Sequence, residues 1–329
     1  MDGVRRSARA IIGIAVLVPL VGAAAWDARS TGTLAGARTG LTIIAPAGTG
    51  GGWDTNARQL QAVMRETGVV TNPQVVNIPG AGGTIGLAQL AQMEGRGDVV
   101  MITGSAMVGG VEINDSPVSL DQVTTIARTT DDYEVVVVPA DSPFESMDDA
   151  VAAWREDPGS VAVGGGSLGS TDQLLALQLA DEVGVPPAEI NYIAYSGGGE
   201  AVRALLSGAS SIGISGYNEF ADQIAAGRLR ALAMSAPEPQ PAVGIPTLYE
   251  LGYDVHQANW RGVVAPPGLT QEQEAELTLI LEETLGTEQW DTVLENNRWI
   301  DAELVGPPFR DFVEEETARV GRLLGDAGL

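Results

Sequence analysis

Short apolar runs alternate with longer amphipathic stretches along most of this chain. Residues 41–44 form one apolar run, and after a glycine-rich stretch Ala57, Leu60 and Met64 recur at helical spacing. A short apolar run indicates a buried strand, whereas apolar residues at every third or fourth position indicate a helix with one buried face. The alternation predicts an α/β fold in which parallel sheets carry helices on both faces.

The same order of strand, glycine-rich loop and helix recurs along the chain. The loops lie at residues 45–54, 78–86, 164–172, 195–200 and 215–218. In parallel sheets, ligands bind at the carboxyl ends of the strands, where all of these loops are predicted to lie. Two loops precede the continuous apolar run 135–138 and three follow it. This order predicts two domains with a ligand cleft between them.

The predicted domain limits follow from these units. Residues 40–139 form the first part of domain 1, residues 140–235 form domain 2, and residues 236–329 complete domain 1. Within this last part we expect a short helix at 247–251 and a strand at 256–265. The acidic C-terminal helices are expected to pack on domain 1. We also expect a strand at 229–234 and helices at 271–285, 288–297 and 308–324.

Residues 1–26 have the composition of an export signal. The segment begins with the basic residues Arg5, Arg6 and Arg9. An apolar run follows and ends in small residues, as a cleavage site requires. This pattern predicts a signal peptide or an uncleaved signal anchor, and the small, polar residues 27–39 predict a linker. The protein is therefore expected to be exported to the periplasm or the extracellular space, with or without a membrane tether.

The composition excludes several classes of function. The net charge is −25 and all 18 basic residues are arginines, so the surface repels nucleic acid. Without cysteine there is no disulfide or thiolate nucleophile, and without lysine there is no Walker-type phosphate site and no Schiff base. The single histidine, His256, cannot build a histidine-rich metal site. We predict no catalytic residue, no cofactor and no metal, with carboxylate-dependent catalysis left as an alternative.

The glycine-rich loops carry the predicted ligand contacts. A strand that ends in glycines before a helix leaves free backbone N–H groups at the positive end of the helix dipole, which favours an anion. An ordinary strand-to-helix turn is the alternative. Asp54 or Thr55 is expected to cap the helix after the first loop. Arg261 is predicted either to bind a second carboxylate or to pair with a nearby acid. The predicted contacts are Gly50, Gly51, Gly52, Trp53, Asp54, Gly80, Ala81, Gly82, Gly83, Ser105, Ser167, Ser170, Thr171, Tyr195, Gly197, Gly198 and Arg261.

A series of short motifs follows this order along most of the chain. They are Gly51–Asp54, Asn77–Gly83, Asp157–Gly159, the Gly-Ser loop 164–170, Tyr195–Gly197, Leu229–Met234, the stretch 245–252 and Ala265–Gly268. In this order they resemble the solute-binding proteins of tripartite tricarboxylate transporters, the Bug receptors. The chain departs from the family pattern at Gln173, Ser196 and Arg261.

The resemblance implies an exported receptor with a two-domain, periplasmic-binding-protein-like (type II) α/β fold. Its domains, joined by crossing strands, would close on a small organic acid of the di- or tricarboxylate class. Backbone N–H groups and waters would hold the acid, and a membrane permease would accept it. We expect a monomer. A carboxylate-dependent enzyme on this scaffold and a ligand-sensing module for a membrane kinase are the alternatives.

Overall fold

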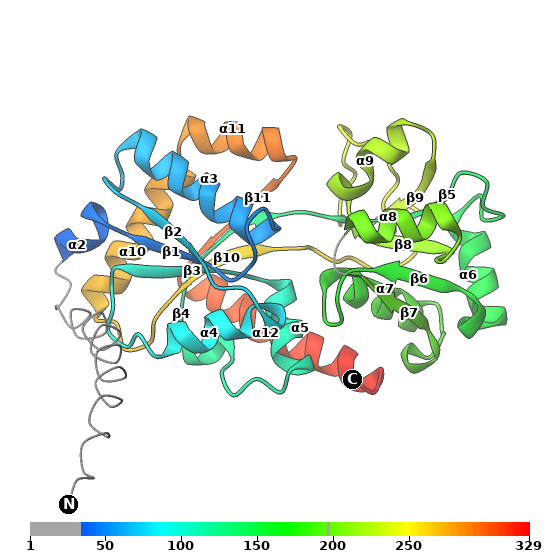
Figure 1. Ribbon diagram of the computed structural model, residues 1–329, viewed down its shortest axis with the longest axis horizontal. Coiled ribbons are helices and arrows are strands. Elements are labelled where there is room, and N and C mark those ends of the chain that lie inside the picture. The colour runs from blue at the N-terminus through cyan, green and yellow to red at the C-terminus, as the bar shows by residue number, and fades with distance from the viewer. Residues whose placement is uncertain (1–33, 196–197) are drawn as a thin grey trace, which may run out of the picture.

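The computed structural model describes residues 34–195 and 198–329 of the chain. These residues form two lobes that lie side by side, each built around one β-sheet (Figure 1). The predicted export signal at 1–26 lies outside the described residues. None of the described helices is both long enough and apolar enough to cross a membrane.

The first lobe contains a six-stranded mixed sheet. Its strands are β1 (Thr42–Ala45), β2 (Gln74–Asn77), β3 (Val99–Gly104), β4 (Thr124–Asp131), β10 (Arg261–Ala265) and β11 (Ile300–Val305), in the order β11-β4-β10-β3-β1-β2. β1 runs parallel to β2 and β3, whereas β10 runs antiparallel to β3 and β4, and β11 runs antiparallel to β4. The carboxyl ends of β1, β2 and β3 therefore meet at one edge, beside the start of β10.

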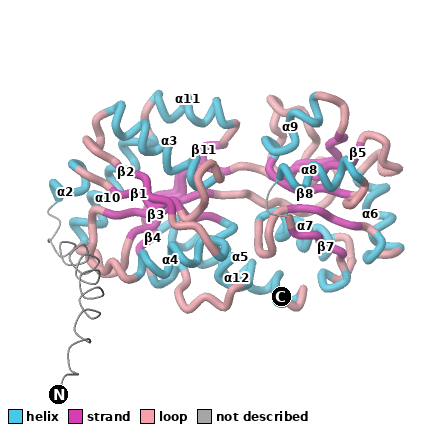
Figure 2. Tube along the Cα trace, viewed as in Figure 1, coloured by secondary structure: helices cyan, strands magenta, loops and turns pink. Residues whose placement is uncertain are grey.

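Helices cover both faces of this sheet (Figure 2). One face carries α2 (Leu34–Thr39), α3 (Gly52–Thr67), α10 (Gln271–Leu285) and α11 (Glu288–Asn297), and the other carries α4 (Thr84–Ala91), α5 (Ser105–Ile113) and α12 (Pro307–Asp326). Successive strand residues point to opposite faces, so Ile43 packs with Leu60 of α3 while Ile44 packs with Leu87 of α4. The buried faces of these helices thus fix the direction in which each strand end points.

The second lobe contains a five-stranded mixed sheet. Its strands are β5 (Glu134–Pro139), β6 (Ala162–Gly165), β7 (Asn191–Ala194), β8 (Ile212–Gly216) and β9 (Leu229–Met234), in the order β7-β6-β8-β5-β9. One face carries α6 (Met147–Glu156) and α7 (Thr171–Glu182), and the other carries α8 (Gly198–Ser207) and α9 (Tyr217–Ala225). β5 is antiparallel to both of its neighbours, whereas β6 is parallel to β7 and β8.

Two extended segments join the lobes, one between β4 and β5 and one between β9 and β10 (Figure 1). The segments pair with each other: Asn259 N–H donates to Asp132 O at 2.8 Å, and Asp132 N–H donates to Asn259 O at 3.3 Å. The C-terminal helix α12 contacts both lobes, because it packs on α5 and α7, and its Arg319 donates to Gln257 Oε1 at 3.0 Å. The prediction that the C-terminal helices pack on the first domain therefore describes only part of the contacts of α12.

The structure differs from the sequence predictions in its sheets and its lobe limits. Both sheets are mixed rather than parallel, because β5 and β10 enter their sheets from the other lobe and not through a helix on the same sheet. β5 belongs to the second sheet, and Leu248 and Val255 pack in the core of the second lobe. The chain therefore changes lobe between β4 and β5, and again just before β10, rather than after residues 139 and 235.

Three local predictions also differ. β10 begins at Arg261, and residues 256–260 form the crossing segment instead of the first half of a strand. Residues 247–251 form turns rather than a helix. Residues 34–39 of the predicted linker form α2, in which Arg38 forms ion pairs with two glutamates of α10.

Candidate functional site

The first glycine loop is held in shape by Asp54. Its carboxylate accepts hydrogen bonds from Gly50 N–H at 2.8 Å, from Arg58 Nε at 2.9 Å and from Asn77 Nδ2 at 2.7 Å. The Arg58 hydrogen bond contributes most to lowering the pKa of Asp54 to about 2, and the Gly50 and Asn77 donors lower it further. Asp54 therefore ties the loop to β2, since Asn77 is the last residue of that strand.

The start of α3 presents backbone donors. α3 begins at Gly52, with Gly51 as its N-cap. The sequence prediction of an N-cap at Asp54 or Thr55 is therefore wrong. Thr55 N–H makes the first bond back along the helix, to Gly51 O at 2.9 Å. The amides of Gly52, Trp53 and Asp54 lie in the first turn, where no carbonyl of the helix reaches them, and they form the positive end of the helix dipole.

The second glycine loop lies against the first through Trp53. Residues 80–83 all have positive φ angles, between 48° and 132°, a conformation that favours glycine. A side chain on Gly83 would come within 2.7 Å of the Trp53 ring, and one on Gly104 would come within 3.1 Å of the indole nitrogen. Trp53 therefore packs between the second loop and the end of β3, and brings two predicted loops together.

The third glycine loop, in the second lobe, touches α5 of the first lobe. Ser105 Oγ and Thr171 Oγ1, both predicted as ligand contacts, lie 2.8 Å apart in a buried hydrogen bond. A Cβ on Gly109 would lie 2.0 Å from the carbonyl oxygen of Gly169. The two hydroxyls thus already bond each other, and they join the lobes near the close backbone contact of Gly109 with Gly169.

Internal hydrogen bonds also order the rest of this Gly-Ser loop. Ser170 is the N-cap of α7, and its Oγ accepts from Gln173 N–H at 3.5 Å. Gln173 Oε1 in turn accepts from Gly169 N–H at 2.7 Å. Ser167 is exposed at the turn of the loop. Of the predicted serines in this loop, Ser167 is therefore the more accessible one.

The fourth loop follows β7. The hydroxyls of Tyr195 and Ser210 lie 3.1 Å apart in a hydrogen bond, and Tyr195 N–H donates to Gly165 O at 2.9 Å. Gly198 is the first residue of α8. Gly197 lies outside the described residues. The described part of this loop is thus bonded to the β6 edge of the second sheet.

Arg261 is a buried cation at the start of α3. Only 6% of the residue is exposed, and a Cβ on Gly52 would lie 3.1 Å from its Nη2 atom. Nη2 also lies 3.9 Å from Asp132 Oδ2, and the guanidinium carbon lies 5.3 Å from the centre of the Trp299 ring. Nη1 is buried and has no hydrogen-bond partner among the described residues. The predicted pairing with a nearby acid therefore occupies one side of the guanidinium and leaves the other side free.

Buried carboxylates near Arg261 were missed by the sequence analysis. Glu134, the first residue of β5, is 0% exposed, and burial raises its pKa well above the usual range, as do the carboxylates of Asp172 and Asp132. Burial also raises the pKa of Asp172 to about 6, although Gly166 N–H donates to it at 2.7 Å. The sequence signal that could have revealed Glu134 is its position as an acidic residue at the start of an otherwise apolar strand.

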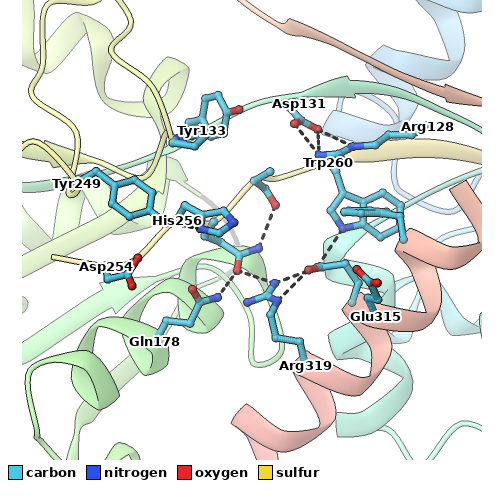
Figure 3. A pocket seen from close by; sticks show the side chains of 15 residues that line it. Arg128, Asp131, Tyr133, Gln178, Tyr249, Asp254, His256, Trp260, Glu315 and Arg319 are labelled. Atoms are coloured by element: carbon cyan, nitrogen blue, oxygen red, sulfur yellow. Dashed lines mark hydrogen bonds and ion pairs between the residues drawn. The ribbon is translucent and has the colours of Figure 1, made fainter. Parts of the chain in front are cut away.

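A pocket of about 610 Å³ lies between the crossing segments and α12 (Figure 3). None of the predicted ligand contacts lines it. Its charged groups include two ion pairs, Arg319 with Glu316 at 2.8 Å and Arg128 with Asp131 at 2.6 Å. Because both arginines of this pocket are paired with carboxylates, we place the candidate site at the glycine loops and Arg261, where Nη1 lacks a partner among the described residues.

Sequence comparison identifies the relatives of this chain. The sequence profile described as "Tripartite tricarboxylate transporter family receptor" matches residues 56–329. Protein BugT of Bordetella pertussis is 31% identical over 235 residues, which cover 69% of this chain and 71% of BugT. A protein encoded in the tcbD-tcbE intergenic region of Pseudomonas sp. strain P51 is 30% identical over 239 residues, covering 69% of this chain and 68% of that protein.

Solved structures confirm the predicted fold class. The periplasmic binding protein BugD superposes with a TM-score of 0.73 at 21% identity, over 88% of this chain and 98% of BugD. MatC of Rhodopseudomonas palustris with bound malate gives 0.70 at 22% identity, over 87% and 99% of the two chains. Another R. palustris protein, with adipate, gives 0.75 at 22% identity, over 88% and 97%. The fold is the two-domain α/β fold of periplasmic binding proteins, and the sequence matches show that the chain belongs to the family of tripartite tricarboxylate transporter receptors.

Proposed function

We propose that this protein is an exported receptor that captures a small organic acid between its lobes and delivers it to the permease of a tripartite transporter. The observation that carries the proposal is the buried guanidinium of Arg261, whose Nη1 lacks a partner among the described residues and lies beside the first turn of α3. Such a group binds a carboxylate through charge-assisted hydrogen bonds. The malate and adipate in the R. palustris structures support a carboxylate as the ligand.

The free donors are sufficient for a useful affinity. A micromolar Kd corresponds to about −8 kcal/mol. Each charge-assisted hydrogen bond contributes about 1.5–3 kcal/mol, and a helix N-terminus adds about 0.3–2 kcal/mol. Four such bonds, two from Arg261 and two from the α3 amides, give about 6–12 kcal/mol before the cost of ordering the ligand is subtracted. No lysine or metal is needed to reach this range.

The second lobe completes the proposed site when the lobes close. The two crossing segments are the natural hinge, because they are extended and pair with each other through few hydrogen bonds. Because Ser105 and Thr171 already join the lobes, a ligand enters when the lobes open, and closure returns the loops of the second lobe over a ligand that lies on α3. The first lobe contributes the proposed contacts 50–54, 80–83, Ser105 and Arg261. The second lobe contributes Ser167, Ser170, Thr171, Tyr195, Gly197 and Gly198.

Thermal unfolding in the presence of candidate acids tests the proposal. We expect citrate, malate, adipate or a related acid to raise the Tm of the protein, because a ligand that binds only the native state stabilises it. Arg261→Gln should weaken binding of that acid by at least about tenfold. Arg65→Gln, on the exposed side of α3, is the matched control and should leave the affinity unchanged.

Two results would contradict this function. The first is a panel of acids that leaves the Tm unchanged at millimolar concentration. The second is equal affinity in wild type and Arg261→Gln. The acid should also be recovered chemically unchanged after incubation, since an enzyme on this scaffold would convert it. Cell fractionation and crosslinking to membrane proteins test export and the permease partner.

A further inference from the structure

A carboxylate without a partner is buried close to Arg261. Neither side-chain oxygen of Glu134 accepts a hydrogen bond from the described residues. The amide of Asn259 is near enough to favour the charged form of Glu134, but it makes no hydrogen bond of normal geometry with it. A Cβ on Gly216 would lie 4.0 Å from Glu134 Oε2 and 3.4 Å from Asp132 Oδ2. Both carboxylates therefore lie at the start of α9, facing the junction of the lobes.

Negative charge exceeds positive charge around Glu134. Asp132 and Asp172 both act on it electrostatically, and Glu219 adds to the negative potential at those two residues. Arg261 is the cation that acts on Glu134, yet its ion pair in the described structure is with Asp132, at 3.9 Å. A buried carboxylate without a partner is costly. Among the described residues, the site therefore combines an unpaired donor, Arg261 Nη1, with an unpaired carboxylate, Glu134.

We propose that the ligand is an organic acid that also carries a positively charged nitrogen. Its carboxylate binds Arg261 and the α3 amides, and its ammonium group binds the free oxygens of Glu134, with Asp172 as a second acceptor. This proposal rests on the proposed function and adds the substrate class. A ligand with both charges satisfies both free groups at once. It also meets less long-range repulsion from a protein of net charge −25 than a dianion does.

The proposal fixes the direction of proton exchange on binding. Burial and the neighbouring carboxylates raise the pKa of Glu134, so the free receptor keeps a proton there at higher pH than usual. Burial raises the pKa of Tyr192, and the charges of Asp172 and Glu134 raise it further. A ligand ammonium favours the charged carboxylate, so its binding releases a proton. A second ligand carboxylate would instead accept a hydrogen bond from protonated Glu134, and its binding would take up a proton.

Matched pairs of acids test the proposal by isothermal titration calorimetry. Succinate and aspartate form one pair, and glutarate and glutamate form the other, because the members of each pair differ by one amino group. Repeating each titration in two buffers with different ionisation enthalpies gives the number of protons exchanged. We expect the amino member of a pair to bind at least about tenfold more tightly, the size of one charge-assisted contact, with release of protons.

Variants assign the effect to the buried carboxylate. Glu134→Gln should bring the affinities of a pair to within about threefold of each other and abolish proton release, because only the charged contact is lost. Asp172→Asn should reduce the preference less, and it serves as a second variant if Glu134→Gln fails to fold. Glu66→Gln, on an exposed part of α3, is the matched control and should keep the full preference.

The outcomes separate this proposal from the function on which it rests. Equal affinity for both members of each pair, or proton uptake on binding, would overturn the proposed substrate class while the carboxylate receptor stands. Retention of the full preference in Glu134→Gln would also overturn it. If neither member of any pair binds and the acids of the thermal panel also fail, the proposed function is wrong and this inference falls with it.

Discussion

The contact between Gly109 and Gly169 leaves no room for a side chain, so Gly109→Ala is expected to disturb the junction of the lobes. The added methyl group would lie 2.0 Å from the Gly169 carbonyl oxygen, whereas a carbon–oxygen contact needs about 3.3 Å. Overpacking costs about 1–3 kcal/mol, and loss of the hydrogen bond between Ser105 and Thr171 adds about 1 kcal/mol. The higher helix propensity of alanine offsets about 1 kcal/mol of this loss of stability. We therefore expect a net loss of about 1–3 kcal/mol.

Denaturant unfolding of matched variants measures this loss. Gly325→Ala is the control, because Gly325 also lies in a helix and no described atom outside its chain neighbours and its own helix backbone lies within 4 Å of its Cβ position. The control should be as stable as wild type or up to about 1 kcal/mol more stable. Gly109→Ala should have a lower unfolding midpoint, and small-angle X-ray scattering should show a more open molecule. A Gly109→Ala protein as stable as the control would refute close contact between these backbones.

Three further predictions concern charged groups. The folded pKa of Asp54 is about 2, below the ordinary value of 3.8. The pairing of Asp54 therefore stabilises the protein above about pH 4, and this stabilisation is lost as the pH falls towards 2. In Asp54→Asn this part of the acid sensitivity of the Tm should disappear. The folded pKa of Asp172 is about 6, above its ordinary value, so stability should fall as the pH rises from about 4 to about 6. Asp172→Asn should flatten that part of the Tm profile, and an unchanged slope would show that burial of this carboxylate is not the cause. Arg319→Gln removes contacts with Glu316 and Gln257; because its side chain is 29% exposed, scanning calorimetry should show a loss of only about 0.5–1 kcal/mol, and a drop several times larger would mean that α12 holds the hinge more strongly than these contacts suggest.

Local sequence patterns predicted the elements whose burial follows a simple rule. The strand at 229–234 and the helix at 288–297 have the predicted limits. The same patterns did not indicate β4 and β11, in which charged side chains, and in β4 also threonines, are mixed with apolar ones. These two strands depend on pairing with each other and on the pairing of β4 with β10, which lies far along the chain. A local pattern does not contain that information.

The candidate site likewise contains residues that local sequence patterns indicated and residues that they did not. The glycine loops and Arg261 were visible because glycine-rich turns and an arginine beside a strand are local features. The burial of Glu134, and of most of the Asp132 side chain, was not visible, because it arises where the two crossing segments pair and both lobes close over them. An acid before an apolar strand is usually solvated. Only the long-range arrangement turns these residues into a buried, incompletely paired cluster.

The path of the chain through the two lobes has a consequence for folding during synthesis. β10 lies between β3 and β4, yet the whole of the second lobe separates it from them in sequence. The second sheet has all its strands once Met234 has emerged, whereas the first sheet lacks an inner strand until Ala265 follows. The inserted lobe should therefore assemble first. Until β10 is completed, β3 and β4 keep unpaired edges that are open to pairing with other chains.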